Sequence, residues 1–147
     1  MELKEQLRSD LATAMREGQT HRRDVLRLIM AAIKQTEVDT RKSLDDDGVQ
    51  DVLRKQVKLR QESIADFTRA GRQSEVDKEL AEIAIIEEYL PRMMPREEIE
   101  QLARSIIVEV GATDSKGIGQ VMSLLMPQVK GRADGRVVNE VVRGLLQ

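Results

Sequence analysis

The segment Pro91-Arg92-Met93-Met94-Pro95 separates two long stretches of sequence, in a chain of 147 residues. Proline lacks the backbone N–H that a helix needs, and it disfavours helical backbone at the residue before it. One helix should therefore end before Pro91, and Pro95 suits the first position of the next helix. The sequence predicts two helical subdomains, an N-terminal one over residues 1–90 and a C-terminal one over residues 96–147.

Upstream of this boundary, apolar residues recur at helical spacing, and no stretch alternates as a β-strand does. Four helices are predicted there, with short breaks between them. Their expected boundaries are Gly18, a cap at Thr20, the break at Asp45–Gly48, Gly71 as a left-handed C-terminal cap and a capping pair of Ser74 and Asp77.

Downstream of Pro95, the spacing predicts a helix that ends at Gly111 and two short helices at about 116–130 and about 135–146. Gly131 is expected to cap the first of these short helices, and the Asp134 side chain to cap the second by accepting backbone N–H bonds. We expect an all-α fold: an N-terminal bundle of long helices followed by a small three-helix C-terminal subdomain.

The composition excludes several classes of function. The chain has no cysteine, so thiolate catalysis and cysteine-ligated metals are excluded. Its only aromatic residues are Phe67 and Tyr89, too few for a platform that stacks nucleic-acid bases. The net charge of −2 predicts no general affinity for polyanions, so only a local basic patch would bind one. No apolar run is long enough to predict a signal peptide or a membrane span, and we expect a cytoplasmic protein.

Two glycines, Gly117 and Gly119, form a G-x-G pattern. No strand precedes them, and Met122 stands where a dinucleotide-binding fingerprint has its third glycine. A helix start at this point could still hold an anion through its free N–H groups. We favour a structural role, in which Gly117 eases entry into a helix and Gly119 lets two helices approach closely.

Other candidate sites are weaker. The segment from Ser43 to Arg54 has the acids of a calcium loop at its third and fifth positions and the glycine at its sixth, but its first position is serine and its last is arginine, which would repel the ion. A solvated helix cap is the better interpretation. The only histidine, His21, lies beside two arginines and has no nucleophile at a recognisable spacing. No catalytic residues, metal site or cofactor are therefore predicted, and an independent enzyme is the least expected outcome.

Basic residues form three groupings, any of which could contact a phosphate backbone. The alternative is an ordinary helix surface in which acids and bases are interleaved. The groupings are Arg22, Arg23, Arg27 and Lys34; Lys55, Lys58, Arg60 and Arg69; and Lys116, Lys130, Arg132, Arg136 and Arg143.

A series of short motifs, in order over nearly the whole chain, resembles the YqeY-like family. That family is related to the tail domain of the B subunit of tRNA-dependent amidotransferases, which act on Glu-tRNA and Asp-tRNA. The motifs include Ala14-Met-Arg-Glu-Gly18, Arg23-x-x-Leu26-Arg27-Leu28, Ala31-Ala-Ile-Lys34, Glu87-x-Tyr-Leu-Pro91, Gly119-x-Val-Met122 and Gly131-x-Ala-Asp-Gly135.

The resemblance implies an all-helical fold and a role in contacting tRNA, whereas the amidotransferase (carbon–nitrogen ligase) chemistry belongs to other domains. We therefore expect a non-catalytic, tRNA-associated helical module, with no membrane or DNA partner and with an amidotransferase or another translation-related protein as a further candidate partner. The RNA-binding candidates are Lys116, Lys130, Arg132, Arg136 and Arg143, with Arg22, Arg23 and Arg27 as a second patch.

Two alternatives to a tRNA-associated module are compatible with the sequence. One is a protein-interaction or homo-oligomeric module without direct RNA binding, in which the last two helices present an apolar groove. The other is an accessory member of a carbon–nitrogen ligase complex. The groove of the first alternative would consist of Val121, Met122, Leu125, Val138, Val141, Val142 and Leu145.

Overall fold

The computed structural model describes residues 2–147, and the ordered elements in this range are seven α-helices and one short 3₁₀ helix. No strand occurs among these residues, which confirms the predicted all-α class. The chain divides into two compact units, one ending at Leu90 and the other beginning at Pro91.

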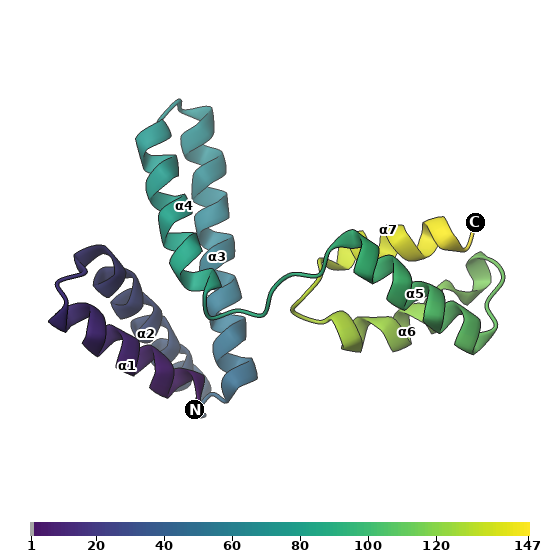
Figure 1. Cartoon of the computed structure of the whole chain (residues 1–147), viewed down its shortest axis with the longest axis horizontal. Helices are drawn as coiled ribbons and strands as arrows, with labels where there is room; N and C mark the ends of the chain where they lie inside the picture. The colour runs from purple at the N-terminus through teal and green to yellow at the C-terminus, as the bar shows by residue number, and fades with distance from the viewer. Residues whose placement is uncertain (1) are drawn as a thin grey trace. The chain divides into compact units, whose positions relative to one another are not determined.

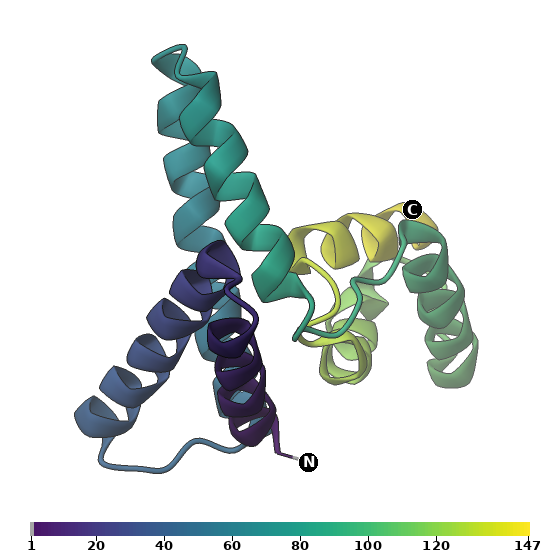
Figure 2. The same cartoon turned by 60° about the vertical axis from the view of Figure 1, so that its left-hand side comes forward.

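The first unit consists of two helical hairpins (Figures 1 and 2). Helices α1 (Leu3–Arg16) and α2 (Thr20–Thr40) form one hairpin, and α3 (Asp46–Arg69) and α4 (Gln73–Glu87) form the other. The first part of α3 and the end of α4 lie against the α1–α2 hairpin, whereas the far part of the α3–α4 hairpin extends away from it.

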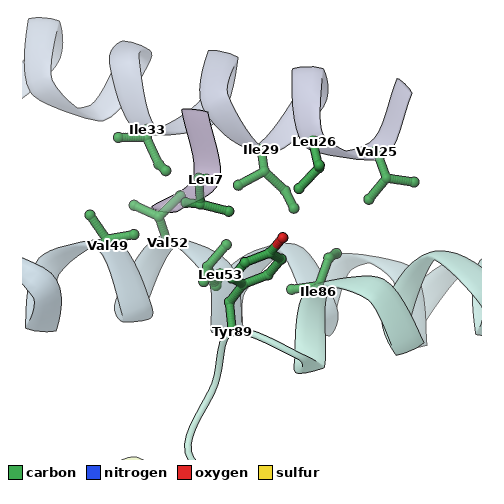
Figure 3. Packing of buried hydrophobic residues seen from close by; sticks show 10 residues of the cluster. All are labelled: Leu7, Val25, Leu26, Ile29, Ile33, Val49, Val52, Leu53, Ile86 and Tyr89. Atoms are coloured by element: carbon green, nitrogen blue, oxygen red, sulfur yellow. The ribbon is translucent and has the colours of Figure 1, made fainter. Parts of the chain in front are cut away.

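Aliphatic side chains from all four helices form the core of this unit, where the two hairpins meet (Figure 3). Tyr89, just after α4, is part of this core and is only 9% exposed. Burial of each large aliphatic side chain contributes roughly 1.5–3 kcal/mol, so this cluster holds the hairpins together. The cluster comprises Leu7, Val25, Leu26, Ile29, Ile33, Val49, Val52, Leu53, Ile86 and Tyr89.

The second unit contains α5 (Arg96–Val110), the 3₁₀ helix η1 (Ser115–Gly117), α6 (Ile118–Val129) and α7 (Gly135–Leu145). Its core lies among the three α-helices and is again aliphatic. The residues expected to form an apolar docking groove are part of this core, because each short helix must bury its apolar face within the unit. Val121, Leu125, Val138, Val141 and Val142 are buried, and Met122 and Leu145 are half-buried.

Most of the predicted helix ends are confirmed by backbone geometry. Gly18, Gly71, Gly111 and Gly131 all have φ between 69° and 79°, the left-handed conformation in which glycine has no steric penalty. Each of them follows a helix. Asp45 caps α3 through a 2.8 Å bond from the Gly48 N–H, so the acidic break is a helix cap, as the sequence predicted.

Three predicted helix starts are wrong by a residue or more. Thr20 is already the first residue of α2, and Pro95 precedes α5 rather than opening it, since its ψ of 152° is extended. The Ser74–Asp77 capping pair does not form, because α4 begins at Gln73 and places Ser74 inside the first turn. The Asp77 carboxylate instead accepts a bond from the Gln73 side chain at 2.9 Å.

The two glycines of G-x-G match the sequence prediction only in part: Gly117 is the residue directly before α6, at the predicted helix entry, but Gly119 does not have its predicted role. A Cβ on Gly119 would have no heavy atom within 4 Å, so this residue does not permit a close helix approach. A Cβ on Gly117 would lie 2.6 Å from the Ala112 Cβ, which is far inside van der Waals contact. Gly117 therefore lets the α5–α6 connection fold tightly against itself.

Candidate functional site

The connection between α6 and α7 concentrates exposed positive charge. Gly131 takes the left-handed conformation two residues after the end of α6, and Asp134 caps α7 by accepting the Arg136 N–H at 2.8 Å. The short connection lies at one end of the α6–α7 hairpin (Figure 1). Because α6 ends at Val129 and α7 begins at Gly135, Lys130, Arg132 and Arg136 lie in or directly beside this connection. Lys130 and Arg136 are exposed, and Arg132 is half-buried.

Arg132 also has a structural role. Its side-chain Nε donates to the Arg92 carbonyl at 3.1 Å, and its own carbonyl accepts the Met94 N–H at 2.7 Å. These two bonds fix the segment before α5 against the α6–α7 turn, and they bring the backbone of a fourth basic residue, Arg92, to this site. Sequence reasoning missed Arg92 because it lies 40 positions from Arg132. Only the long-range hydrogen bonds reveal that the two are neighbours.

Acidic side chains near this turn are already engaged. Asp134 is the only acid between Lys130 and Arg136, and its carboxylate caps α7. Glu140, one turn beyond Arg136 on the same helix, lies 3.4 Å from Arg96. We call Arg92, Lys130, Arg132 and Arg136 the turn cluster. Since none of these four has a carboxylate within ion-pair distance in the part of the chain that the structure describes, the cluster has a local excess of positive charge.

The structure does not bring the other two C-terminal candidates to the turn cluster. Lys116 belongs to η1, before the 12-residue helix α6, so it lies roughly 18 Å along the helix from Lys130. Arg143 lies in the last turn of α7, seven residues from Arg136 and on the same face, about 10 Å further along. Its Nε donates to Asn139 Oδ1 at 2.6 Å.

The second predicted patch, in the first unit, is largely neutralised. Both terminal nitrogens of Arg22 contact the same Glu88 oxygen, at 2.6 and 2.5 Å. Arg23 pairs with the adjacent Asp24 at 2.9 Å. Arg27, whose nearest polar partner is the Met15 sulfur at 3.9 Å, remains without a carboxylate partner among residues 2–147. This patch therefore offers one free cation rather than three.

The contacts of Lys4, Ser43 and Leu44 around Glu37, at one end of the α1–α2 hairpin, were not predicted from the sequence. Lys4 of α1 donates to Glu37 of α2 at 2.8 Å and to the Ser43 hydroxyl at 2.9 Å. The Leu44 N–H donates to the same Glu37 oxygen at 2.7 Å. The bond from Lys4, followed by that from Leu44, holds the pKa of Glu37 below its usual range. Glu37 is thus an anchored carboxylate that joins three segments.

Neither a metal site nor a membrane span is found in the described range. Within residues 2–147, no group of three or more His, Asp or Glu side chains is placed to hold a metal ion. His21 is an exposed residue of the first turn of α2. None of the helices in this range is both long enough and apolar enough to cross a membrane.

Comparison with known proteins identifies relatives over nearly the whole chain. A family model described as "Yqey-like protein" matches residues 4–146. A protein of Kluyveromyces lactis named "Altered inheritance of mitochondria protein 41, mitochondrial" is 31% identical over 136 residues, which cover 90% of this chain and 69% of that protein. A protein of the same name from Pyrenophora tritici-repentis is 28% identical and covers 93% of this chain and 77% of its own length.

A more distant match concerns part of the chain. The E subunit of glutamyl-tRNA(Gln) amidotransferase from Saccharolobus solfataricus is 37% identical over 67 residues, which are 43% of this chain and 10% of that protein. This partial match supports the kinship with an amidotransferase tail domain that the sequence motifs indicated. The matched protein is an E subunit, whereas the motifs resemble the tail of a B subunit.

Proposed function

The chain belongs to the Yqey-like protein family, and on that premise we propose that it is a non-catalytic helical module that contacts the phosphate backbone of tRNA. Support for tRNA as the partner comes from the partial match to an amidotransferase whose name includes a tRNA substrate. The amidotransferase chemistry is not part of this proposal, because the match covers only 10% of that protein.

The observation that carries the proposal is the turn cluster. Four basic residues lie around one turn, and the nearby acids Asp134 and Glu140 are engaged in a helix cap and in an ion pair with Arg96. Lys and Arg contacts to phosphate position a protein on nucleic acid without reading its sequence. The two aromatic residues both lie in the first unit, so base stacking has no role at the turn.

Binding through so few phosphate contacts should be weak and strongly dependent on salt. Each phosphate neutralised contributes about 0.7–0.9 to the slope of log K against log salt concentration. The overall charge of −2 opposes the approach of RNA, so we expect a dissociation constant in the micromolar range or weaker at low salt.

The experiment is a titration of the chain with tRNA at several salt concentrations, using the double variant Lys130→Glu with Arg136→Glu. Both side chains are exposed, and neither has a side-chain bond among the described residues, so folding should be retained. Arg132 is less suitable because its side chain also holds the Arg92 carbonyl. We expect at least a tenfold loss of affinity at low salt and a salt slope that is smaller by about 1.4–1.8.

A matched control is the double variant Lys55→Glu with Lys58→Glu, which changes the net charge equally at two exposed sites of α3. It should bind tRNA much more tightly than the turn-cluster variant. If the two double variants lose affinity equally, the effect is one of net charge and the proposed interface is wrong. Absence of tRNA binding by the unmodified chain at low salt would also refute the proposal.

The partial match to the amidotransferase favours a second candidate, an accessory chain that supplies RNA contact to a carbon–nitrogen ligase complex. Purification of the chain from its own cells tests it: recovery of an amidase chain supports this role, and its repeated absence opposes it.

Cell fractionation in the same preparation tests the cytoplasmic location expected from the sequence. The two relatives matched over most of this chain are named as mitochondrial.

A further inference from the structure

The α1–α2 hairpin of the first unit contains an open groove of about 440 Å³. It is lined by the apolar residues Met30, Ala31 and Ile33 of α2 and by the basic residues Lys4, Arg8 and Lys34. The volume is within the range of small-molecule sites, roughly 300–1,000 Å³. The groove is thus lined by both apolar and positively charged side chains.

Charge is unbalanced along this groove. Glu37 is its only acidic lining residue, and Lys4, Ser43 and the Leu44 N–H already engage that carboxylate. Arg8 and Lys34 are exposed, and neither has a carboxylate within ion-pair distance among residues 2–147. Two free cations therefore face a groove whose one anion is already satisfied.

A second depression of about 340 Å³ continues the groove past Lys34 and Glu37. It adds Arg41 and Lys42, two further exposed basic residues, and the apolar side chain of Val38, which is 61% exposed. No further acid lines this part. The same combination of positive charge and exposed apolar surface is therefore present on both sides of Lys34.

We infer that this groove binds a small molecule that carries a phosphate monoester on an apolar group, with Arg8 and Lys34 contacting the phosphate and Met30, Ala31 and Ile33 contacting the apolar part. Arginine and lysine are the usual side-chain partners of phosphate. A nucleic-acid backbone would leave the apolar lining residues without a partner, which favours a small amphipathic anion. The inference concerns the first unit and does not depend on the proposed tRNA contact in the second.

The test uses hexyl phosphate as the probe, with inorganic phosphate and hexanol as its two halves. Backbone amide resonances of the full chain are followed by NMR during each titration. We expect hexyl phosphate to shift the amides of Arg8, Met30 and Lys34 and to bind at least tenfold more tightly than either half. Equal affinity for hexyl phosphate and inorganic phosphate, or shifts scattered over both units, would overturn the inference.

The double variant Arg8→Glu with Lys34→Glu should lose at least tenfold in affinity for hexyl phosphate. The variant Lys55→Glu with Lys58→Glu carries the same charge change on α3, outside the groove, and should bind as the unmodified chain does. Circular dichroism checks that both remain folded. Equal binding by the two variants would overturn the inference.

A co-sedimentation assay and a titration with tRNA distinguish the possible sources of the phosphate. The chain is sedimented with phosphatidylcholine vesicles that contain phosphatidic acid. If it co-sediments and the double variant Arg8→Glu with Lys34→Glu does not, the site binds a lipid headgroup. Binding of hexyl phosphate without co-sedimentation assigns it to a soluble molecule. Groove amides that shift with tRNA but not with hexyl phosphate would refute the small-molecule site and extend the RNA surface to this unit instead.

Discussion

The hydroxyl of Tyr89 donates a hydrogen bond to the Asp10 carboxylate at an O–O distance of 2.5 Å, across 79 positions of sequence. Asp10 belongs to α1, and Tyr89 follows α4, so the bond joins the two ends of the first unit. The Tyr89 ring lies among the core side chains of Figure 3. One residue therefore supplies both apolar contact and a polar link to the opposite hairpin.

Replacement of Tyr89 by phenylalanine should separate these two contributions. The ring remains, but the carboxylate of Asp10 loses its donor, and a hydrogen bond to a charged group stabilises a protein by about 1.5–3 kcal/mol. We expect the free energy of unfolding to fall by an amount near the lower end of that range, because Asp10 is only half-buried. Replacement by alanine should cost more, about 3–5 kcal/mol. Urea unfolding followed by circular dichroism measures both, and a phenylalanine variant as stable as the unmodified chain would contradict the role of the bond.

The same bond makes the first unit sensitive to alkaline pH. Burial of the ring, followed by the hydrogen bond to Asp10 and the charge of that carboxylate, raises the pKa of Tyr89 well above its ordinary value of 10.0. The unfolded chain therefore releases the phenolic proton first, so the stability from the neutral phenol is complete below pH 10 and is lost as the pH rises above it. Tyr89 is the only tyrosine and the chain has no tryptophan, so its absorbance near 295 nm reports this ionisation alone.

In the folded chain, this absorbance change should occur at higher pH than in the chain unfolded in urea. The variant Asp10→Asn removes the negative charge and should shift the titration of the folded chain toward that of the unfolded one. Identical titration curves for the folded and unfolded chains would show that the environment of Tyr89 differs from that described.

The helices were predictable because their signals are local. Gly71, Gly111 and Gly131 mark helix ends through their own backbone conformation, and Asp134 caps α7 two residues away.

Whether a basic side chain of the candidate surface is free or paired depends on partners far along the chain. Arg22 meets Glu88 across 66 positions, and Arg132 meets the Arg92 carbonyl across 40. Periodicity carries no signal for such pairs, so the sequence overestimated the patch at Arg22 and Arg23 and missed Arg92.

The different surroundings of Gly117 and Gly119 give opposite effects of the same substitution. Gly119 lies inside α6 with open space beside it, so Gly119→Ala should stabilise the second unit by about 0.5–1 kcal/mol through helix propensity alone. Gly117→Ala should destabilise it by about 1–3 kcal/mol, since the new Cβ would meet the Ala112 Cβ and the backbone must move. Gly144→Ala in α7, which also has open space, is a matched control expected to behave like Gly119→Ala. Thermal unfolding ranks the three variants. A stabilising Gly117→Ala would show that the connection between α5 and α6 is less tight than described.

Acid should weaken the junction of the first unit at Glu37. The bond from Lys4 and that from the Leu44 N–H lower the pKa of this carboxyl from its ordinary value of 4.5. As the pH falls, the unfolded chain takes up the proton first, so the stability from ionised Glu37 is complete above about pH 4.5 and is lost as the pH falls through the lower value of the folded chain. Glu37→Gln removes the charge at every pH, so the unmodified chain should be more stable than this variant at pH 6, and the difference should shrink toward pH 3.

Fluorescence of Tyr89 during urea unfolding follows this unit selectively, because it contains the only tyrosine of the chain. Glu62→Gln is the control, because Glu62 is exposed on α3 and makes no side-chain bond among residues 2–147. If the difference between the unmodified chain and Glu37→Gln is the same at both pH values, Glu37 is not the charged anchor of this junction.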